Sequence, residues 1–308
     1  MLKFIRTPEE QFQKLIGYPF AEHYVDVDMG EEVSSGASVA MRMHYVDEGP
    51  KDADPVLMMH GEPSWSYLYR NMIPICAAAG HRVIAPDLVG FGKSDKPTDV
   101  ASYSYQSHME WMQTFIDKLN LNNITLVCQD WGSLIGLRLA AENPDRFKAI
   151  VVGNGMLPTG DQSVPLAFYA WKTFALYSPW FPISKIVASG TFKKLSKAEQ
   201  QAYDAPFPSK EYKAGTRAFP KLVPVTPDDP ATVANRNAWE TLYRWDKPFL
   251  TTFSNGDPIT RGGDEYMRER IPGSQGLNHQ TLRGGHFLQE DSPQAFAKAV
   301  NDLLAATS

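Results

Sequence analysis

Short apolar runs alternate with helical patterns along the first half of the chain. We predict strands at 39–46, 55–59, 82–85, 124–128 and 148–152, with helices between them at 65–79, 105–119 and 131–142. Strands that alternate with helices are typical of a parallel sheet whose two faces are both covered. The first half of the chain therefore predicts an α/β fold with a mostly parallel sheet flanked by helices.

A proline-rich helical segment interrupts this pattern after residue 157. It contains apolar helical stretches such as 166–176, and Ser196 with Glu199 forms a capping box that predicts the start of another helix. The β/α pattern then resumes, with a helix at 228–243, strands at 249–253 and 279–282, and helices at 264–269 and 293–304. We therefore predict one core domain, formed by 1–157 and 229–308, into which a helical cap domain is inserted at 158–228.

The composition is that of an ordinary globular protein, with 308 residues, 43% hydrophobic, 21% charged and a net charge of −5. This acidic balance favours neither nucleic acid nor an anionic membrane as a partner, and no apolar run reaches the roughly 18 residues of a membrane span. The N-terminal segment lacks the apolar region of a signal peptide, so we expect a cytoplasmic protein. Cys76 and Cys128 are too few for a disulfide framework, and no Cys or His spacing resembles a metal site.

The segment CQDWGS at 128–133 joins a predicted strand to a predicted helix. A sharp turn of this kind can present one side chain above the edge of the sheet, as a nucleophile elbow does, and Asp130 occupies that place. The chemistry also needs an oxyanion hole made of two backbone N–H groups. One N–H belongs to Trp131, and the loop HGEP at 60–63 can supply the other from Glu62.

A histidine and a second acid complete the candidate site. His286 lies in GGHF at 284–287, after the last predicted strand, and Asp257 follows the strand predicted at 249–253. The acid orients the histidine and stabilises its charged form. The chain order of Asp130, Asp257 and His286 is that of the nucleophile, acid and histidine in an α/β-hydrolase.

Four segments together resemble the haloalkane dehalogenases of the α/β-hydrolase superfamily. They are HGEPSW at 60–65, PDLVGFGKSD at 86–95, QDWG at 129–132 and GGHF at 284–287. Single motifs are shared by many hydrolases, but the combination is selective, and the resemblance covers nearly the whole chain. The glutamate after His-Gly is similar to the subfamily with a second halide-binding tryptophan in the cap and its acid after the penultimate strand. The resemblance therefore implies that Trp131 and Trp171 bind the halide and that Asp257 is the acid.

The resemblance also implies the reactants. The substrate would be a small haloalkane, water would be the second reactant, and the products would be an alcohol and a halide ion, with no cofactor or metal. We expect a monomer or a small homo-oligomer. Apolar residues of the cap are expected to line the substrate pocket, namely Phe168, Phe174, Leu222 and Val223.

Aspartate and tryptophan suit this chemistry. An aspartate has a reference pKa of about 3.9, so at pH 7 it is ionised and can displace a halide from saturated carbon. The product of that step is an alkyl ester on Asp130, and His286 can act as the general base for the water that hydrolyses it. A departing halide needs hydrogen-bond donors but no proton, and an indole N–H donates without accepting.

Two positions depart from the family pattern. Cys128 stands where the elbow usually has glycine, and Ser133 stands where glycine is common after Gly132. Both side chains are small, so we expect a slightly altered turn and retained function. Asn154 lies at the position that holds the acid in another subfamily, which favours Asp257 as the acid here.

Other interpretations are open at this point. The strongest is an epoxide hydrolase with the same Asp130 nucleophile, in which cap tyrosines would protonate the leaving alkoxide. The candidate tyrosines are Tyr169, Tyr177, Tyr203 and Tyr212. A catalytically silent binding member of the fold is a third hypothesis. Simpler roles also exist for single residues, since Asp130 could be a helix N-cap, Asp257 a turn residue and Trp171 a packing residue on an apolar helix.

Overall fold

An eight-stranded sheet forms the centre of the computed structural model, which describes residues 3–27, 41–162, 164 and 166–307. The strand order is β10-β9-β8-β7-β4-β5-β3-β2. The strands are β2 (His23–Val27), β3 (Met41–Glu48), β4 (Pro55–Met59), β5 (Arg82–Pro86), β7 (Ile124–Asp130), β8 (Phe147–Gly155), β9 (Phe249–Ser254) and β10 (Gln280–Leu282). Only the β2–β3 and β3–β5 pairs are antiparallel in this sheet, which confirms the predicted mostly parallel arrangement. Residues 39 and 40 of the first predicted strand lie outside the described residues.

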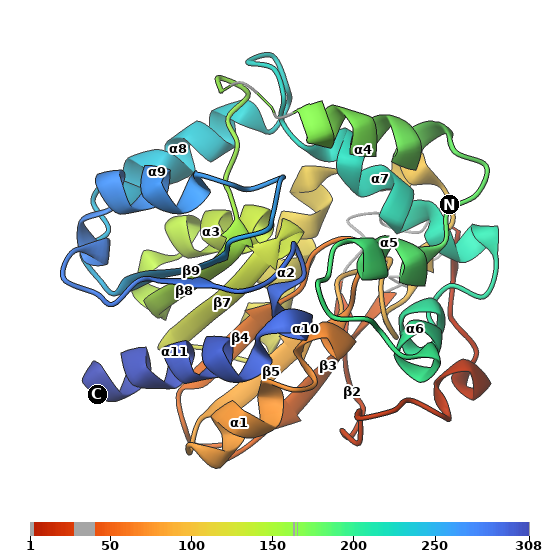
Figure 1. Cartoon of the computed structure of the whole chain (residues 1–308), viewed down its shortest axis with the longest axis horizontal. Coiled ribbons are helices and arrows are strands. Elements are labelled where there is room, and N and C mark those ends of the chain that lie inside the picture. The colour runs from red at the N-terminus through yellow and green to blue at the C-terminus, as the bar shows by residue number, and fades with distance from the viewer. Residues whose placement is uncertain (1–2, 28–40, 163, 165, 308) are drawn as a thin grey trace, which may run out of the picture.

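Helices cover both faces of the sheet (Figure 1). One face carries α1 (Ile73–Ala78), α10 (Leu288–Asp291) and α11 (Pro293–Ala306), and the other carries α2 (Tyr105–Lys118), α3 (Trp131–Glu142), α8 (Thr232–Leu242) and α9 (Gly263–Arg270). Two separate apolar clusters correspond to these two faces. Burial on both faces explains the continuous apolar runs of the central strands, such as the fully buried β4.

The N-terminal part of the sheet was only partly predicted. The structure adds β2, and it adds a small ribbon in which β1 (Phe4–Ile5) pairs with β6 (Lys96–Pro97).

The helix predicted at 65–79 is wrong as one element, because a 3-10 turn at Ser66–Tyr69 precedes α1. Pro74 lies in the first turn of α1, where its missing N–H costs nothing, and so it marks a new helix start. The other 3-10 turns are Glu9–Phe12, Val100–Ser102, Pro144–Arg146, Lys210–Lys213 and Pro272–Ser274.

Four helices lie between β8 and α8, within the predicted insertion. They are α4 (Leu166–Tyr177), α5 (Ile183–Ser189), α6 (Lys197–Asp204) and α7 (Ala214–Leu222), and they lie together beside the ends of the central strands in Figure 1. The capping box of Ser196 and Glu199 is confirmed at the start of α6. Phe219 of α7 stacks on Trp131, the first residue after β7, with ring centroids 4.3 Å apart. This contact shows that the helices cover the carboxyl edge of the sheet.

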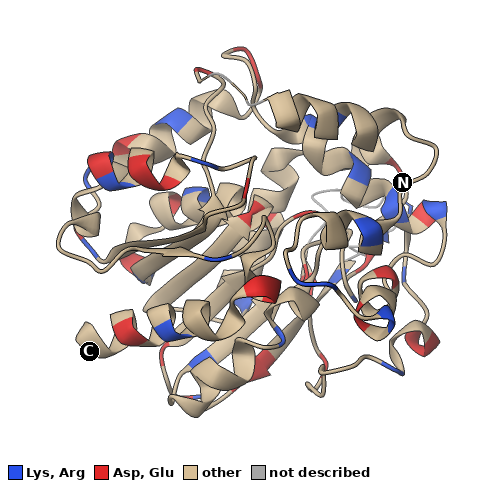
Figure 2. Cartoon of the chain, in the orientation of Figure 1, with Lys and Arg blue, Asp and Glu red and all other residues tan. Residues whose placement is uncertain are grey.

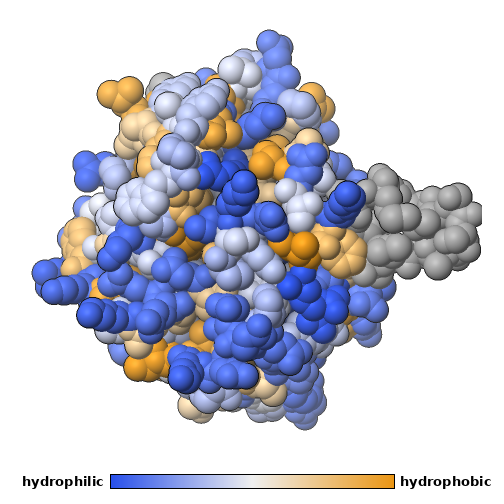
Figure 3. Space-filling view, turned by 90° about the vertical axis from the view of Figure 1, so that its right-hand side faces the viewer, coloured by the Kyte–Doolittle hydropathy of each residue, from blue (hydrophilic) through white to orange (hydrophobic). Residues whose placement is uncertain are grey.

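The surface carries charges of both signs, interspersed over the helices, while the central strands are nearly free of them (Figure 2). The face seen in Figure 3 shows hydrophobic side chains in small separate groups among hydrophilic ones. Among the described helices, none is both long and apolar enough to cross a membrane.

Candidate active site

Asp130 lies at a sharp turn between β7 and α3. Its backbone has φ 51° and ψ −127°, a strained conformation for a residue with a side chain, and such strain is concentrated at functional sites. Two glycines make room for the turn. A Cβ on Gly132 would lie 2.0 Å from the Met59 carbonyl oxygen, and a Cβ on Gly61 would lie 2.3 Å from Asp130 Oδ1. The sequence therefore builds the sharp strand-to-helix turn that was predicted as a nucleophile elbow, and it brings the loop after β4 against the Asp130 carboxylate.

The turn accommodates both residues that depart from the family pattern, Ser133 and Cys128. The single hydroxyl hydrogen of Ser133 has two carbonyl acceptors within reach, those of Asp130 (2.6 Å) and Met156 (3.0 Å), and the hydroxyl oxygen accepts from the Met156 N–H (2.8 Å). It therefore ties the elbow to the end of β8. The Cys128 side chain is buried, with its sulfur 3.8 Å from the Val151 carbonyl. The elbow keeps its sharp turn with both substitutions.

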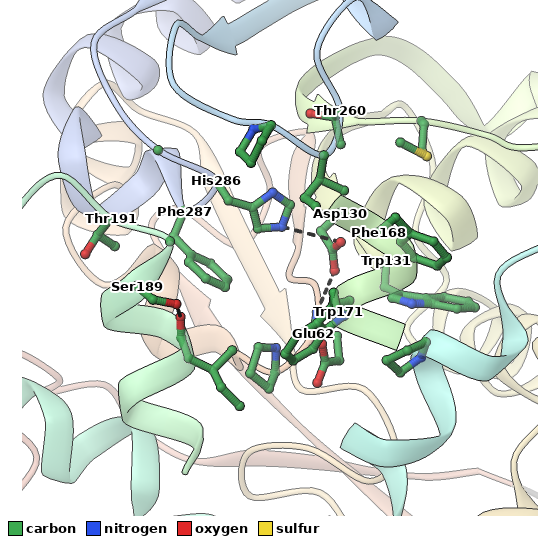
Figure 4. A pocket seen from close by; sticks show the side chains of 18 of the residues that line it. Glu62, Asp130, Trp131, Phe168, Trp171, Ser189, Thr191, Thr260, His286 and Phe287 are labelled. Atoms are coloured by element: carbon green, nitrogen blue, oxygen red, sulfur yellow. Dashed lines mark hydrogen bonds and ion pairs between the residues drawn. The ribbon is translucent and has the colours of Figure 1, made fainter. Parts of the chain in front are cut away.

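His286 lies between the two aspartates. Its Nδ1 is 3.1 Å from Asp257 Oδ2, and its Nε2 is 3.5 Å from Asp130 Oδ2. Figure 4 shows the Asp130 carboxylate between His286 on one side and the Glu62 backbone on the other. The structure thus brings the three predicted catalytic residues together from the carboxyl ends of β7, β9 and β10.

Asp257 is buried and fully hydrogen-bonded. It accepts from the Ile259 N–H (2.9 Å) and from the Thr260 N–H (3.3 Å) and hydroxyl, besides facing His286. Burial alone would raise the pKa of Asp257, but the His286 charge and these hydrogen bonds lower it to about 2. Asp257 is therefore a permanent anion beside the imidazole. Burial lowers the pKa of His286, but the charges and hydrogen bonds of Asp257 and Asp130 outweigh it and raise that pKa well above 6.5.

Asn154 has a structural role in this site. Its Nδ2 donates to the carbonyls of Gly285 and His286, each at 2.9 Å, while its Oδ1 accepts from the Ser254 N–H at 2.8 Å. The residue that stands at the alternative acid position thus holds the loop that carries His286. This arrangement leaves Asp257 as the carboxylate beside the ring.

A second set of hydrogen bonds joins the loop of His286 to the cap. The Phe287 N–H donates to the Gly190 carbonyl at 3.1 Å. The Asp291 carboxylate accepts from the Lys193 N–H (2.7 Å) on the cap side and from the Gly285 N–H (2.8 Å) on the core side. The cap segment 190–193 and the segment 285–291 therefore form one connected unit.

Glu62 contributes to the site through its backbone. Its N–H donates to Asp130 Oδ1 at 2.7 Å, which is the geometry of one oxyanion-hole donor. The second predicted donor, Trp131, begins α3 directly after Asp130, but the described bonds of the Asp130 carboxylate do not include its N–H. The Glu62 side chain is buried. This burial, and to a smaller extent the charge of Asp130, raises the pKa of the Glu62 carboxyl group well above 4.5.

A cavity of about 270 Å³ opens over Asp130. Trp131 and Trp171 both line it, with Asp130 and His286, and Trp131 lies on the side of Asp130 away from His286 in Figure 4. Trp131 is held by its stacking on Phe219 and by a tilted contact with Tyr105, with centroids 5.4 Å apart. Two indoles therefore reach one mainly apolar cavity that also contains the Asp130 carboxylate.

The predicted pocket residues divide into two pairs. Phe168 and Val223 line the cavity. Phe174 and Leu222 do not line it, so their expected position is corrected: Phe174 packs on Trp171 and Phe181 instead. A second cavity of about 210 Å³ adjoins the first, and Phe168 and Val223 are among the residues that line both.

The four candidate tyrosines do not line the cavity that contains Asp130. Tyr177 and Tyr169 are exposed, and Tyr203 is buried with its hydroxyl on Glu290 at 2.5 Å. Tyr212 packs at the edge of the core, and no tyrosine is among the described residues that line the 270 Å³ cavity. Among the described residues that line this cavity, no phenol is therefore present to protonate a leaving alkoxide.

Several site residues escaped the sequence analysis. Pro220 of α7 lines the cavity, Phe219 of the same helix stacks on Trp131, and Thr260 bonds to Asp257. A turn aspartate often accepts from the backbone two residues on, which fits the Ile259 N–H, but this rule does not indicate a bond to Thr260. Phe219 carried no signal, since an aromatic residue in an amphipathic helix usually packs in a core.

A family model described as "alpha/beta hydrolase fold" matches residues 54–293, so the chain belongs to this superfamily. A haloalkane dehalogenase of Psychrobacter cryohalolentis is 56% identical over 96% of both chains. One of Mycobacterium marinum is 52% identical over 96% of this chain and 98% of its own. Within the superfamily, the chain belongs to the haloalkane dehalogenases, which confirms the resemblance predicted from four segments.

Solved structures agree with this assignment. The haloalkane dehalogenase DpaA of Paraglaciecola agarilytica, described as tetrameric, has a TM-score of 0.87 at 36% identity, with 99% of both chains covered. A putative ancestral haloalkane dehalogenase has a TM-score of 0.78 at 29% identity, over 92% of this chain and 99% of its own.

Proposed function

We propose that the chain hydrolyses the carbon–halogen bond of small haloalkanes through a covalent ester on Asp130. One observation carries this proposal: the cavity that contains Asp130 and His286 is also lined by two tryptophans and no described tyrosine. Indole N–H groups can stabilise a departing halide, whereas an epoxide would need an acid. The family assignment is consistent with this activity.

In the first step, one oxygen of Asp130 attacks the carbon that bears the halogen. A carbon–oxygen bond forms as the carbon–halogen bond breaks, and the halide leaves with the bonding electron pair. Asp130 Oδ1 is held by the Glu62 N–H, so the other oxygen, Oδ2, is the free nucleophile. Trp131 and Trp171 receive the halide in the cavity.

In the second step, water attacks the ester carbon of Asp130. His286 Nε2 takes a proton from this water, and Asp257 stabilises the imidazolium. The carbonyl oxygen of this ester, Oδ1, becomes the oxyanion, already at the Glu62 N–H. Collapse of the intermediate transfers the proton from His286 to the departing alcohol, and the regenerated carboxyl group of Asp130 ionises. The net products are alcohol, halide and one proton.

Substrate comparison tests the proposal. Short bromoalkanes should release bromide, and epoxides of similar size should give no diol. Diol formation without halide release from any haloalkane would contradict the proposal. Absence of any covalent adduct, together with no turnover of either class, would instead favour a silent binding protein.

The halide site can be tested apart from turnover. We expect bromide to quench tryptophan fluorescence, and Trp171→Phe to weaken bromide binding about tenfold or more, because a hydrogen bond to a charged group contributes about 1.5–3 kcal/mol. Trp180→Phe is the matched control, since Trp180 is an exposed indole outside the cavity lining. Equal bromide affinity in wild type and Trp171→Phe would show that Trp171 is a packing residue.

We also propose a monomer or small homo-oligomer that acts in the cytoplasm. DpaA, 36% identical, is described as a tetramer, which supports a small assembly. Cys76 and Cys128 are buried free thiols, as expected in a reducing compartment. Sedimentation velocity should give a species no larger than a tetramer, and a higher mass would contradict the proposal. Recovery in the cytoplasmic fraction of the source cells would test the location.

A further inference from the structure

Gln129 precedes the nucleophile in β7 and contacts the catalytic histidine. Its side chain is fully buried, with Nε2 3.0 Å from His286 Nε2 and 3.3 Å from the His286 carbonyl oxygen. A carboxamide nitrogen carries two hydrogens, and both of these neighbours can accept one. The single amide group therefore bonds to the ring and the backbone of the same residue.

This contact selects one form of the imidazole. The Gln129 amide can donate to His286 Nε2 only when Nε2 carries a lone pair, and Nδ1 then bears the proton that faces Asp257. This neutral form is the one that can take a proton from water. With a proton on Nε2, two donors would face each other at 3.0 Å.

The carboxylates around the His286 ring favour the protonated imidazolium over this neutral form. The titratable groups that face His286 are Asp257 from the loop after β9, Asp130 at the end of β7 and Glu62 from the loop after β4. Asp257 and Asp130 raise the pKa of His286, and an imidazolium cannot act as a base. Neutral His286 therefore needs a group that opposes these carboxylates.

We propose that Gln129 is a positioning residue that holds His286 as the tautomer with the lone pair on Nε2, ready for the water that hydrolyses the ester. This inference rests on the proposed function. A second observation supports it: Gln129 Oε1 is buried without a hydrogen-bond partner in the described part of the chain. Leucine would fill similar space without an unsatisfied polar atom, so packing alone does not account for a carboxamide here.

Separate measurement of the alkylation and hydrolysis steps distinguishes this positioning role of Gln129 from a structural one. Alkylation of Asp130 does not use His286 as a base, whereas hydrolysis does. In rapid-quench single turnovers with a bromoalkane, Gln129→Leu should release the first bromide within about twofold of the wild-type rate. Hydrolysis of the alkyl-enzyme at pH 7.5 should slow by about tenfold, within the range that general bases contribute.

The pH dependence of ester hydrolysis distinguishes a positioning role of Gln129 from a purely structural one. Loss of a donor to Nε2 favours the protonated ring, so the pKa of His286 rises further and the basic form requires higher pH. The acid limb of the hydrolysis profile should therefore move to higher pH in Gln129→Leu, and hydrolysis at pH 9.5 should return to within about threefold of wild type. Gln129→Glu, which adds a carboxylate, should move the limb further in the same direction.

Thr125→Val is the matched control. Thr125 is buried in the same strand, its hydroxyl has no described partner, and valine has nearly the same shape, so both steps should keep wild-type rates. Equal slowing of alkylation and hydrolysis in Gln129→Leu at every pH would overturn the proposal, as would an unchanged hydrolysis profile. A first bromide released by wild type and variant alike would show that the proposed function holds whatever the result for Gln129.

Discussion

Asp130→Ala should abolish halide release from every haloalkane, with a loss of about 10⁴-fold or more, because loss of a nucleophile removes the covalent route completely. The two other carboxyl groups near the ring are poor replacements. Asp257 is buried on the far side of His286, and burial raises the pKa of Glu62 well above 4.5, which disfavours its ionised form. Halide release measured over several turnovers would test this expectation, together with intact mass after incubation with substrate.

Folding can be checked in the same variant. Bromide quenching of tryptophan fluorescence should persist in Asp130→Ala, because Trp131 and Trp171 remain. Residual turnover above a thousandth of the wild-type rate, with no contaminating wild-type enzyme, would show that Asp130 is not the nucleophile.

His286→Gln should convert the enzyme into a single-turnover reagent. The first step keeps its nucleophile and halide site, so about one halide per active site should be released in a burst. The ester on Asp130 then lacks its base, and hydrolysis should slow by about 10²–10⁴-fold. Intact-protein mass spectrometry should show a mass increase equal to the alkyl group of the substrate minus one hydrogen.

The position of the adduct makes this result specific. Peptide mapping should place the alkyl group on Asp130, and the double variant with Asp130→Ala should gain no mass. Steady turnover by His286→Gln at a rate near that of wild type would contradict the role of His286 as the base.

Local signals explain why so much of the site was predictable. The nucleophile turn, the GGHF segment and the HGEP loop each combine an apolar strand with an adjacent motif, and chain order alone assigns their roles. The central strands were also clear, because burial on both faces makes them apolar throughout. The strand β2 carried a weaker signal, since it is short, antiparallel and only partly buried.

Contacts between distant segments could not be predicted in the same way. The bond between Gln129 and His286 joins residues 157 positions apart, and nothing in QDWG indicates where the glutamine points. The cap side of the pocket was ambiguous for another reason. The α4 helix is apolar on most sides, so its sequence does not show which side faces the cavity, and Phe174 was assigned to the wrong one.

The connection between cap segment 190–193 and segment 285–291 has a consequence for redesign. Substrate size and base alignment are linked on that side of the cavity, because a substitution that shifts the cap there also pulls on Gly285 and Phe287. Phe168 lies on α4, between two cavities and away from these bonds. Libraries that enlarge the enzyme's substrate range should therefore begin at Phe168, where selectivity can change while the catalytic rate constant of hydrolysis is kept.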